Sequence, residues 1–198
     1  MRFVITGTSG VGKTFLENVL QEKYGFIQIP KYTDRPKRPN EIEGKGIYFV
    51  DRNELQRPNH NYFFKLSYIG NIYGWKVEDL RNAKNKNLTI AITMESLQSL
   101  LTKDLEFIPI LLYTKLDQMD QLTARIKKQL DYDNLSPENK LKADQTIQKR
   151  LALAETETKN IDKYIKIVQG AKGGKAFNII SDDTLFTEVI PYIQSLIK

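Results

Sequence analysis

The segment GTSGVGKT at residues 7–14 constrains this chain more than any other feature. It fits the pattern GxxxxGK[ST], and it lies after the apolar run RFVIT and before a stretch with helical periodicity, as the pattern requires. Glycines allow the tight turn in which backbone N–H groups point at phosphate oxygens, and the positive end of the following helix adds to the attraction. The segment therefore predicts a loop that binds nucleotide phosphates.

The residue types in this loop have separate expected tasks. The ATP phosphates should be bound by seven residues: Gly7, Ser9, Gly10, Val11, Gly12, Lys13 and Thr14. The Lys13 ammonium can reach the β- and γ-phosphates, and the Thr14 hydroxyl can ligate Mg²⁺ together with phosphate and water oxygens. ATP and Mg²⁺ are therefore the expected cofactors. Because motors, switches and small-molecule kinases all use such a loop, it does not identify the phosphate acceptor.

Short apolar runs alternate with helical segments along the chain. Strands are predicted at 2–6, 88–93, 110–114 and 176–180, and Pro109 is placed before the third of these strands. Strands that alternate with helices predict an α/β fold, in which a parallel sheet is flanked by helices on both faces.

Two helices have clear start or stop signals. The first follows the phosphate loop and should stop at Gly25, where a left-handed C-terminal cap is expected. The second should start at Ser136-Pro137-Glu138 and continue as a helical stripe to the segment GAKGG at 170–174. The members of this stripe are Leu141, Ile147, Leu151 and Ala154.

Composition limits the possible functions. The 198 residues are 40% hydrophobic, without an apolar run near the roughly 18 residues of a membrane span and without a signal peptide, so a single cytoplasmic domain is expected. The chain has no cysteine and only one histidine, His60, which excludes thiol catalysis and thiolate metal sites. The net charge is +6, but the lysines are scattered without a basic stripe, so no nucleic-acid partner is expected.

Two stretches interrupt the alternation of strands and helices. Residues 31–84 are rich in Tyr, Asn, Pro and Gly and predict a small β-rich insertion, whereas residues 117–150 are charged and mostly helical. The remaining ranges, 1–30, 85–116 and 151–198, should form the core of the domain.

The order of segments along the chain resembles that of the guanylate kinase family. After the phosphate loop come YTDRPKRPNEIEGKGIYFV, YIGNIYG, a basic helical segment that ends in QKRL, and IISDD near the C-terminus. This resemblance covers nearly the whole chain and implies a P-loop nucleoside monophosphate kinase fold. It also implies ATP-dependent transfer of a phosphoryl group to GMP or dGMP, an acceptor-binding subdomain at 31–84 and a helical lid at 117–150.

The resemblance also implies roles for individual residues. Arg35, Arg38 and Tyr73 fall where the family holds the phosphate of the acceptor nucleotide, and a guanidinium fork matches phosphate oxygens well. Arg125 and Arg150 match lid positions that face the transferring phosphoryl group, where positive charge stabilises the transition state. The implied catalytic residues are Lys13, Arg38, Arg125 and Arg150.

Several positions that should read the guanine base depart from the family pattern. Phe64 stands where the family places a glutamate for the guanine N1–H and N2–H donors, and Ala91 and Thr93 replace an acidic pair. Trp75 and Lys31 replace serine or threonine. An unpaired buried donor costs about 1–3 kcal/mol, so the identity of the acceptor base stays open.

Further departures lie in the segment GKGIYF and in the lid. A family tyrosine is replaced by Ile47, and Tyr48 one place later should point to the opposite face of its strand. The family's GRG is KKQ at 127–129. Three alternatives therefore remain: another nucleoside or deoxynucleoside monophosphate as acceptor, a ribose phosphate, or a guanylate-kinase-like module that binds proteins without catalysis. The intact Lys13 and Thr14 favour an enzyme, and the oligomeric state is open.

Overall fold

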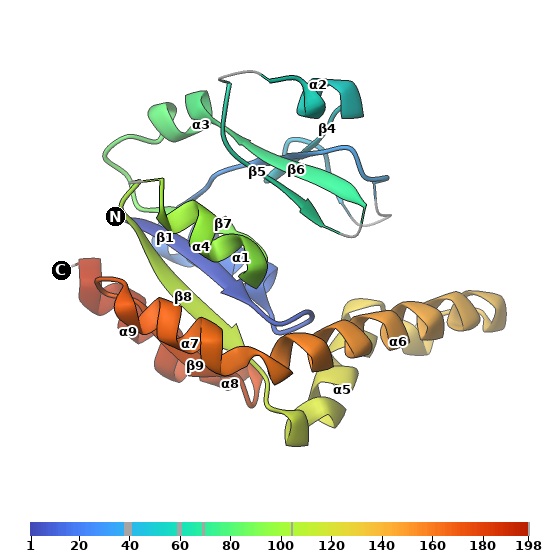
Figure 1. Cartoon of the computed structure of the whole chain (residues 1–198). Helices are drawn as coiled ribbons and strands as arrows, with labels where there is room; N and C mark the ends of the chain where they lie inside the picture. The colour runs from blue at the N-terminus through green and yellow to red at the C-terminus, as the bar shows by residue number, and fades with distance from the viewer. Residues whose placement is uncertain (38–40, 59–60, 69, 104, 198) are drawn as a thin grey trace.

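A five-stranded parallel sheet forms the core of the molecule (Figure 1). The structure is a computed structural model, which describes residues 1–37, 41–58, 61–68, 70–103 and 105–197. The strand order is β2-β7-β1-β8-β9. These strands are β1 (Arg2–Gly7), β2 (Ile27–Gln28), β7 (Leu88–Ala91), β8 (Phe107–Tyr113) and β9 (Lys175–Asn178). The predicted parallel sheet is confirmed.

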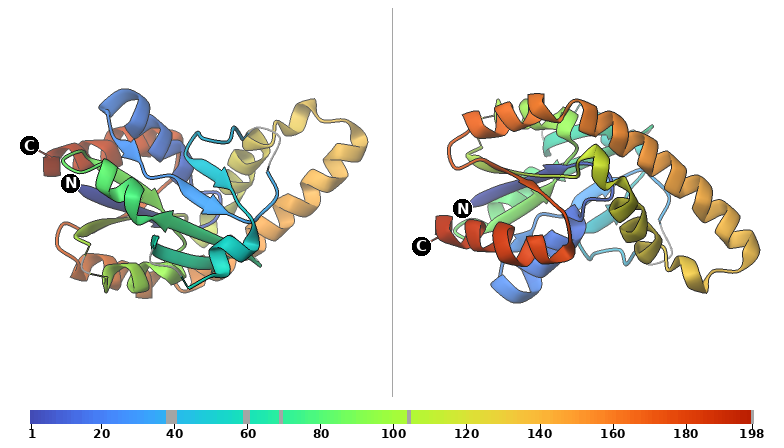
Figure 2. Two further views of the ribbon diagram at one scale, coloured as in Figure 1. Left: turned by 90° about the horizontal axis from the view of Figure 1, so that it is seen from above. Right: turned by 90° about the horizontal axis from the view of Figure 1, so that it is seen from below.

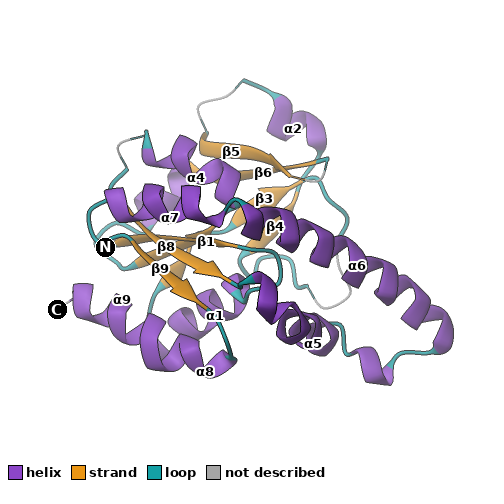
Figure 3. Ribbon diagram, turned by 60° about the horizontal axis from the view of Figure 1, so that its bottom comes forward, coloured by secondary structure: helices purple, strands orange, loops and turns teal. Residues whose placement is uncertain are grey.

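Helices cover both faces of the core sheet (Figure 3). The helices on one face are α1 (Lys13–Tyr24) and α9 (Ile190–Ile197), and those on the other are α4 (Met94–Leu101) and α7 (Ile161–Gly170). Successive side chains of β1 point to opposite faces of the sheet. Phe3 and Ile5 pack under α1 and α9, whereas Val4 packs under α4 and α7. The turn α8 (Asp182–Thr184) and the π-helical segment Leu185–Val189 lead into α9.

The strand β8 contains a proline, and the prediction that Pro109 precedes this strand is wrong. The Leu112 carbonyl accepts the Thr8 N–H after β1, whereas the Tyr113 carbonyl accepts the Ile179 N–H after β9. The backbone N–H and C=O groups of odd-numbered residues in β8 therefore point towards β9. Pairing with β9 begins only at Ile110, after the proline. The missing N–H of the proline consequently removes no bond from the ladder.

The other strand predictions are confirmed in place but not at every end. β7 stops at Ala91, two residues before the predicted end, because α4 begins at Met94. β9 stops at Asn178 instead of residue 180. The predicted helix after the phosphate loop is confirmed, and Gly25 caps it with a φ of 68°.

A second sheet of four strands lies within residues 31–84, in the order β4-β3-β6-β5. Its strands are β3 (Lys31–Thr33), β4 (Ile47–Phe49), β5 (Tyr62–Tyr68) and β6 (Asn71–Lys76). β3 pairs parallel with β4, and the other pairs are antiparallel. The short helices α2 (Arg52–Gln56) and α3 (Val77–Asn82) accompany this sheet. The predicted β-rich segment is confirmed.

Two helices project from the core as an arm (Figures 1 and 2). They are α5 (Met119–Gln129) and α6 (Pro137–Lys159), joined by the 3₁₀ turn η2 (Tyr132–Asn134), and the turn η1 (Leu116–Gln118) leads into α5. Side chains of both helices form a small apolar cluster, whose buried members are Leu122, Ile126, Ile147 and Ala154. Nothing in the described part of the chain is a helix both long enough and apolar enough to cross a membrane.

The prediction of one helical stripe from residue 136 to GAKGG is correct at its start and wrong at its end. The Ser136 hydroxyl caps α6 by accepting the Asn139 N–H at 3.4 Å. α6 ends at Lys159, and Asn160 separates it from α7. Leu141, a predicted stripe member in the second turn of α6, is 64% exposed.

Candidate active site

The phosphate loop lies at the carboxyl edge of the core sheet, between β1 and α1. Gly7, Gly10 and Gly12 have φ values of 148°, 80° and 108°, which favour glycine. A Cβ on Gly7 would lie 1.8 Å from the carbonyl oxygen of Leu112, so a larger residue does not fit. The glycines therefore allow both the turn and the close approach of β8.

Lys13 is the first residue of α1, and its ammonium group folds back onto the loop. Its Nζ donates to the carbonyl oxygens of Gly7 at 2.7 Å and Thr8 at 2.9 Å. Burial lowers the pKa of Lys13 to about 8, against an opposing effect of the Glu157 carboxylate, and the Arg150 charge also lowers this pKa. Glu157 and Arg150 therefore both act electrostatically on Lys13.

Glu157 of α6 enters the phosphate loop. Its Oε2 accepts the backbone N–H of Ser9 at 2.6 Å, so this predicted phosphate-binding residue is already paired. Burial raises the pKa of Glu157, whereas Lys13 and the Ser9 N–H lower it. Sequence reasoning missed Glu157, and the only available signal was its spacing of seven residues from Arg150, which places both on one face of a helix.

Arg35 follows β3 and is held by Glu41. Arg35 Nη1 donates to Glu41 Oε2 at 2.8 Å and to the Pro36 carbonyl at 2.9 Å, and Nη2 pairs with the other carboxylate oxygen. Burial disfavours the charge, but Glu41 and the Tyr73 hydroxyl outweigh burial and raise the pKa of Arg35 above its usual value. The structure thus brings Arg35 and Tyr73 together, and Glu41, which sequence reasoning missed, orients the guanidinium.

The other predicted arginines are placed differently. Arg38 lies outside the described residues. Arg125 of α5 is tied to the segment after β9, because its Nη2 donates to the Ile179 carbonyl at 3.2 Å and its Nε lies 3.8 Å from Asp182 Oδ1. Burial lowers the pKa of Arg125, and Asp182 opposes this effect. Arg150 of α6, by contrast, acts electrostatically on Lys13 and lowers its pKa.

Tyr68 ends β5, and charged groups of the arm influence its pKa. Burial raises the pKa of Tyr68 to about 12, and the nearby carboxylates of Glu157 and Glu95 raise it further. Tyr73 also raises this pKa, and Arg150 lowers it. The electrostatic surroundings of Tyr68 thus include Tyr73 of the second sheet and Glu157 of α6, and Glu157 also contacts the phosphate loop.

Phe64 and Trp75, which stand at guanine-reading positions, are packing residues. They face each other across β5 and β6 with ring centroids 5.9 Å apart, and they are 3% and 2% exposed. Their cluster includes Ile92, which follows β7, and Met94, the first residue of α4. The Thr93 hydroxyl there donates to the Ser96 hydroxyl at 3.0 Å. None of these side chains carries a carboxylate.

Tyr48 points to the face of its strand opposite to Ile47, as predicted, and this face is also opposite to Tyr73. It stacks on Tyr32 of the neighbouring strand, with ring centroids 5.0 Å apart and an angle of 13° between the rings. Thr33, the next residue of that strand, pairs with Tyr73 instead. Because adjacent residues of a strand point to opposite faces, Tyr48 does not join Arg35 and Tyr73.

Glu17 is a second buried carboxylate that sequence reasoning missed. It is 1% exposed on α1, and its Oε2 accepts from Gln28 Nε2 at 3.0 Å. Burial raises the pKa of Glu17 to about 7, while Lys31 opposes this shift. A Cβ on Gly46 would lie only 2.6 Å from the amide oxygen of Gln28, so Gln28 packs closely against Gly46. Gln28 thus joins α1 to the loop before β4.

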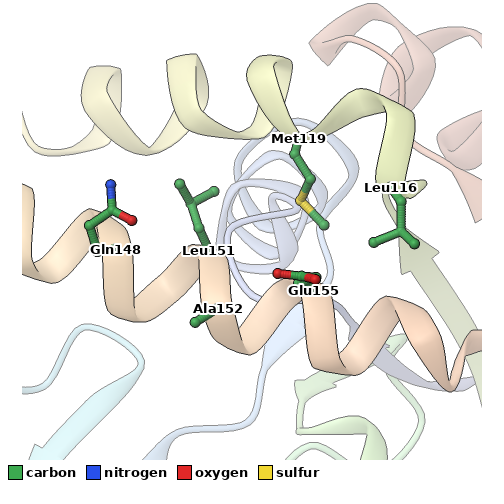
Figure 4. A pocket seen from close by; sticks show the side chains of 6 residues that line it. All are labelled: Leu116, Met119, Gln148, Leu151, Ala152 and Glu155. Atoms are coloured by element: carbon green, nitrogen blue, oxygen red, sulfur yellow. The ribbon is translucent and has the colours of Figure 1, made fainter.

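A groove at the base of the arm separates α6 from the segment that contains η1 and α5 (Figure 4). Its lining residues are Leu116, Met119, Gln148, Leu151, Ala152 and Glu155. Of the predicted site residues that the structure describes, none lines this groove. The candidate active site is therefore the region around the phosphate loop, and not the groove.

Comparison with known proteins identifies the family. The guanylate kinase family model matches residues 1–183. The chain belongs to the guanylate kinase family. The guanylate kinase of Blochmanniella floridana is 27% identical over 201 residues, which cover 98% of this chain and 84% of that protein. The guanylate kinase of a Thermus thermophilus strain is 31% identical over 170 residues, which cover 84% of this chain and 72% of that protein.

A solved structure shows that the fold is shared. The crystal structure of guanylate kinase from Anaplasma phagocytophilum matches with a TM-score of 0.66 at 19% identity, over 99% of this chain and 86% of that one. The fold is therefore the predicted P-loop nucleoside monophosphate kinase fold. Membership in the guanylate kinase family also identifies an enzyme that transfers a phosphoryl group from ATP to a nucleoside monophosphate, and it disfavours a non-catalytic module.

Proposed function

We propose that this guanylate kinase family member transfers the γ-phosphoryl group of ATP to GMP or dGMP. The observation that carries the proposal is the presence of two candidate phosphate-binding groups. Lys13 lies in the phosphate loop, and Arg35 lies beside Tyr73 in the second sheet. Tyr73, Glu157 and Arg150 all influence the pKa of Tyr68, which supports assigning the two groups to one site. The guanylate kinase relatives support guanine as the base.

We assign the donor to the phosphate loop and the acceptor to the second sheet. ATP phosphates would contact the loop at 7–14, and the acceptor phosphate would contact Arg35, Tyr73 and Arg38. Residues 31–84 would form the acceptor-binding subdomain. Residues 117–150 would form the lid, although α6 continues without a break past residue 150.

Thr14 fits the role of a Mg²⁺ ligand. Its side chain is exposed on the first turn of α1, beside the phosphate loop. Among the described residues no group of three or more Asp, Glu, His or Cys side chains could enclose a metal ion. Mg²⁺ in kinases is held by few protein ligands together with substrate phosphates and water, so one hydroxyl is compatible with it. Bound there, the ion would neutralise phosphate charge.

The chain's own cations would stabilise the transfer. An oxygen of the acceptor phosphate forms a bond to the γ-phosphorus while the bond from that phosphorus to the bridging oxygen breaks, and ADP leaves. Negative charge develops around the transferring group, where Lys13 and Arg150 can offset it. No general base is required, because the acceptor phosphate is already an anion. Arg125 would join this set only by leaving Ile179 and Asp182.

A second candidate function is transfer to a nucleoside monophosphate with another base. The observation that favours it is the burial of Phe64 against Trp75, which places an apolar pair where a guanine-reading carboxylate is expected. A guanine held without that carboxylate loses hydrogen bonds from two donors. GMP would then be held mainly through its phosphate.

ADP release from ATP and Mg²⁺ in the presence of single acceptors tests the proposal. The acceptors are GMP, dGMP, AMP, CMP, UMP, dTMP and ribose phosphates. The proposal expects GMP or dGMP to give the highest kcat/KM, with a high KM because the base is weakly held. Preference for another base would support the second candidate, and release without any acceptor dependence would contradict both.

A further inference from the structure

Glu157 joins the arm to the phosphate loop. Its Oε2 accepts the Ser9 N–H at 2.6 Å, although the two residues lie 148 positions apart in the sequence. The side chain is 5% exposed. The chemistry proposed above for the donor and the acceptor makes no use of this carboxylate, so its position needs a separate explanation.

A buried carboxylate is costly unless hydrogen bonds and positive charge replace its water. Burial accordingly raises the pKa of Glu157, and Lys13 and the Ser9 N–H only oppose that rise. An apolar side chain of similar size would avoid this cost. The carboxylate is therefore poorly explained by packing alone, and its contact with the loop is the feature that an apolar residue would not provide.

The neighbouring residue fixes the same end of α6 to the core sheet. The Thr158 hydroxyl donates to the Thr114 carbonyl at 3.0 Å, directly after β8. Two adjacent residues thus attach α6 to the segments that follow β8 and β1. The contact of Thr158 does not involve the phosphate loop, whereas the contact of Glu157 does.

The attached end of α6 sets the position of Arg150. Arg150 and Glu157 are seven residues apart in an unbroken helix, which corresponds to two turns on one face and roughly 10 Å along the axis. Arg150 and Glu157 both act electrostatically on Lys13. A shift of Glu157 relative to the loop would consequently move Arg150 relative to Lys13.

The other arm helix contacts the same loop. A Cβ on Gly10 would lie 3.0 Å from both Ile126 Cγ1 and Leu122 Cδ1 of α5. α5 and α6 are packed together through the cluster that contains these side chains. The arm therefore touches the loop at two consecutive residues, Ser9 through a hydrogen bond and Gly10 through apolar contact.

We propose that Glu157 is a positioning residue that holds the phosphate loop and the arginine-bearing helix α6 in one fixed arrangement through the Ser9 N–H. Glu157 itself does not contact the reacting atoms. It keeps Arg150 beside the phosphates that the loop binds. The proposal rests on the proposed function for its use of ATP, and it is independent of the base that the acceptor carries.

The variants Glu157→Ala and Glu157→Gln test this role. The carboxamide oxygen of glutamine can accept the Ser9 N–H, and alanine cannot. We expect Glu157→Ala to lower kcat by about 30-fold and to change the KM for ATP by less than about threefold, because the loop still binds phosphates while Arg150 is misplaced. We expect Glu157→Gln to keep kcat within about threefold of the unmodified chain.

Two variants on the same turn of α6 are matched controls. Thr158→Val removes the contact with Thr114 and leaves the Ser9 contact in place. Glu155→Ala removes an exposed carboxylate that pairs with Lys159 at 2.7 Å. Both should keep kcat within about twofold, since neither touches the loop. A loss of kcat in Thr158→Val equal to that in Glu157→Ala would overturn the proposal, because any weakening of the α6 attachment would then suffice.

Amide hydrogen exchange at Ser9 reads the contact without turnover, so it stays informative if no acceptor in the panel is phosphorylated. We expect Ser9 to exchange at least about tenfold faster in Glu157→Ala and to stay protected in Glu157→Gln. Equal rates of Ser9 amide exchange in Glu157→Ala and in the unmodified chain would overturn the proposal. Equal loss of kcat in the alanine and glutamine variants would also overturn it, because the carboxylate charge would then matter instead of the hydrogen bond.

Discussion

Arg35 and Glu41 form a two-point ion pair in which each guanidinium Nη donates to one carboxylate oxygen. The Arg35 side chain is 8% exposed, so its orientation is fixed before any acceptor binds. A phosphate that approaches Arg35 meets a guanidinium already held beside Tyr73. If Arg35 binds the acceptor phosphate as proposed, this arrangement lowers the entropic cost of acceptor binding.

Glu41→Ala should therefore weaken acceptor binding. With its partner removed, Arg35 is free to adopt other rotamers, and we expect the KM for the acceptor nucleotide to rise about tenfold while the KM for ATP stays unchanged. Steady-state kinetics with the best acceptor of the panel measures both constants. Glu43→Ala is the control, because that exposed carboxylate accepts the Phe49 N–H at 3.1 Å instead of pairing with Arg35. An unchanged acceptor KM in Glu41→Ala would show that Arg35 needs no orientation.

Phe64→Ala should destabilise the chain, because Phe64 packs against Trp75 in the core cluster. Removing a buried phenylalanine ring costs about 3–5 kcal/mol of unfolding free energy. Urea unfolding measures this cost. Phe186→Ala removes a ring that is 38% exposed and should cost clearly less. If both variants lost the same small amount, Phe64 would not be a core residue, and its ring would be available to a bound base.

Glu17 should make stability depend on pH. Burial raises the pKa of this carboxyl from its ordinary value of 4.5 to about 7, so the folded chain binds the proton more tightly than the unfolded chain. The contribution of Glu17 to stability is thus greatest below about pH 4.5 and falls as the pH rises to about 7. Glu17→Gln removes the ionised form, and its amide oxygen can still accept from Gln28.

We therefore expect Glu17→Gln to raise the unfolding free energy at pH 8 by on the order of 3 kcal/mol and to change it little at pH 4.5. Urea unfolding at both pH values measures the difference. Glu22→Gln, at an exposed position of the same helix, is the matched control. An equal effect of Glu17→Gln at both pH values would mean that the Glu17 proton is bound equally in both states.

The phosphate loop could be predicted because its glycines, Lys13 and Thr14 act within eight consecutive residues. Their conformational and chemical requirements are local, and so the pattern carries them. The same holds for Gly25 at the end of α1 and for Ser136 at the start of α6, where a cap depends on a few neighbouring residues. Pro109 is the counter-example, because its effect depends on where β9 begins in space.

Contacts between distant segments could not be predicted in this way. Glu157 meets Ser9 only because α6 returns to the sheet after leaving it as part of the arm. The local sequence does not distinguish Glu157 from the nearby Glu155, although Glu155 is exposed and pairs with Lys159. Arg125 was expected near the transferring phosphoryl group from resemblance, yet its guanidinium contacts the carbonyl of Ile179. These outcomes depend on the packing of two helices, which the local sequence does not specify.

The most direct test of the central claim is transfer of the label from ATP labelled at its γ-phosphate to a nucleoside monophosphate, with and without Lys13. We predict that the unmodified chain forms a labelled nucleoside diphosphate from GMP or dGMP, and that Lys13→Ala lowers the rate at least about 1000-fold because the transferring charge is no longer offset. Absence of labelled diphosphate with every acceptor, or equal rates with and without Lys13, would contradict the account.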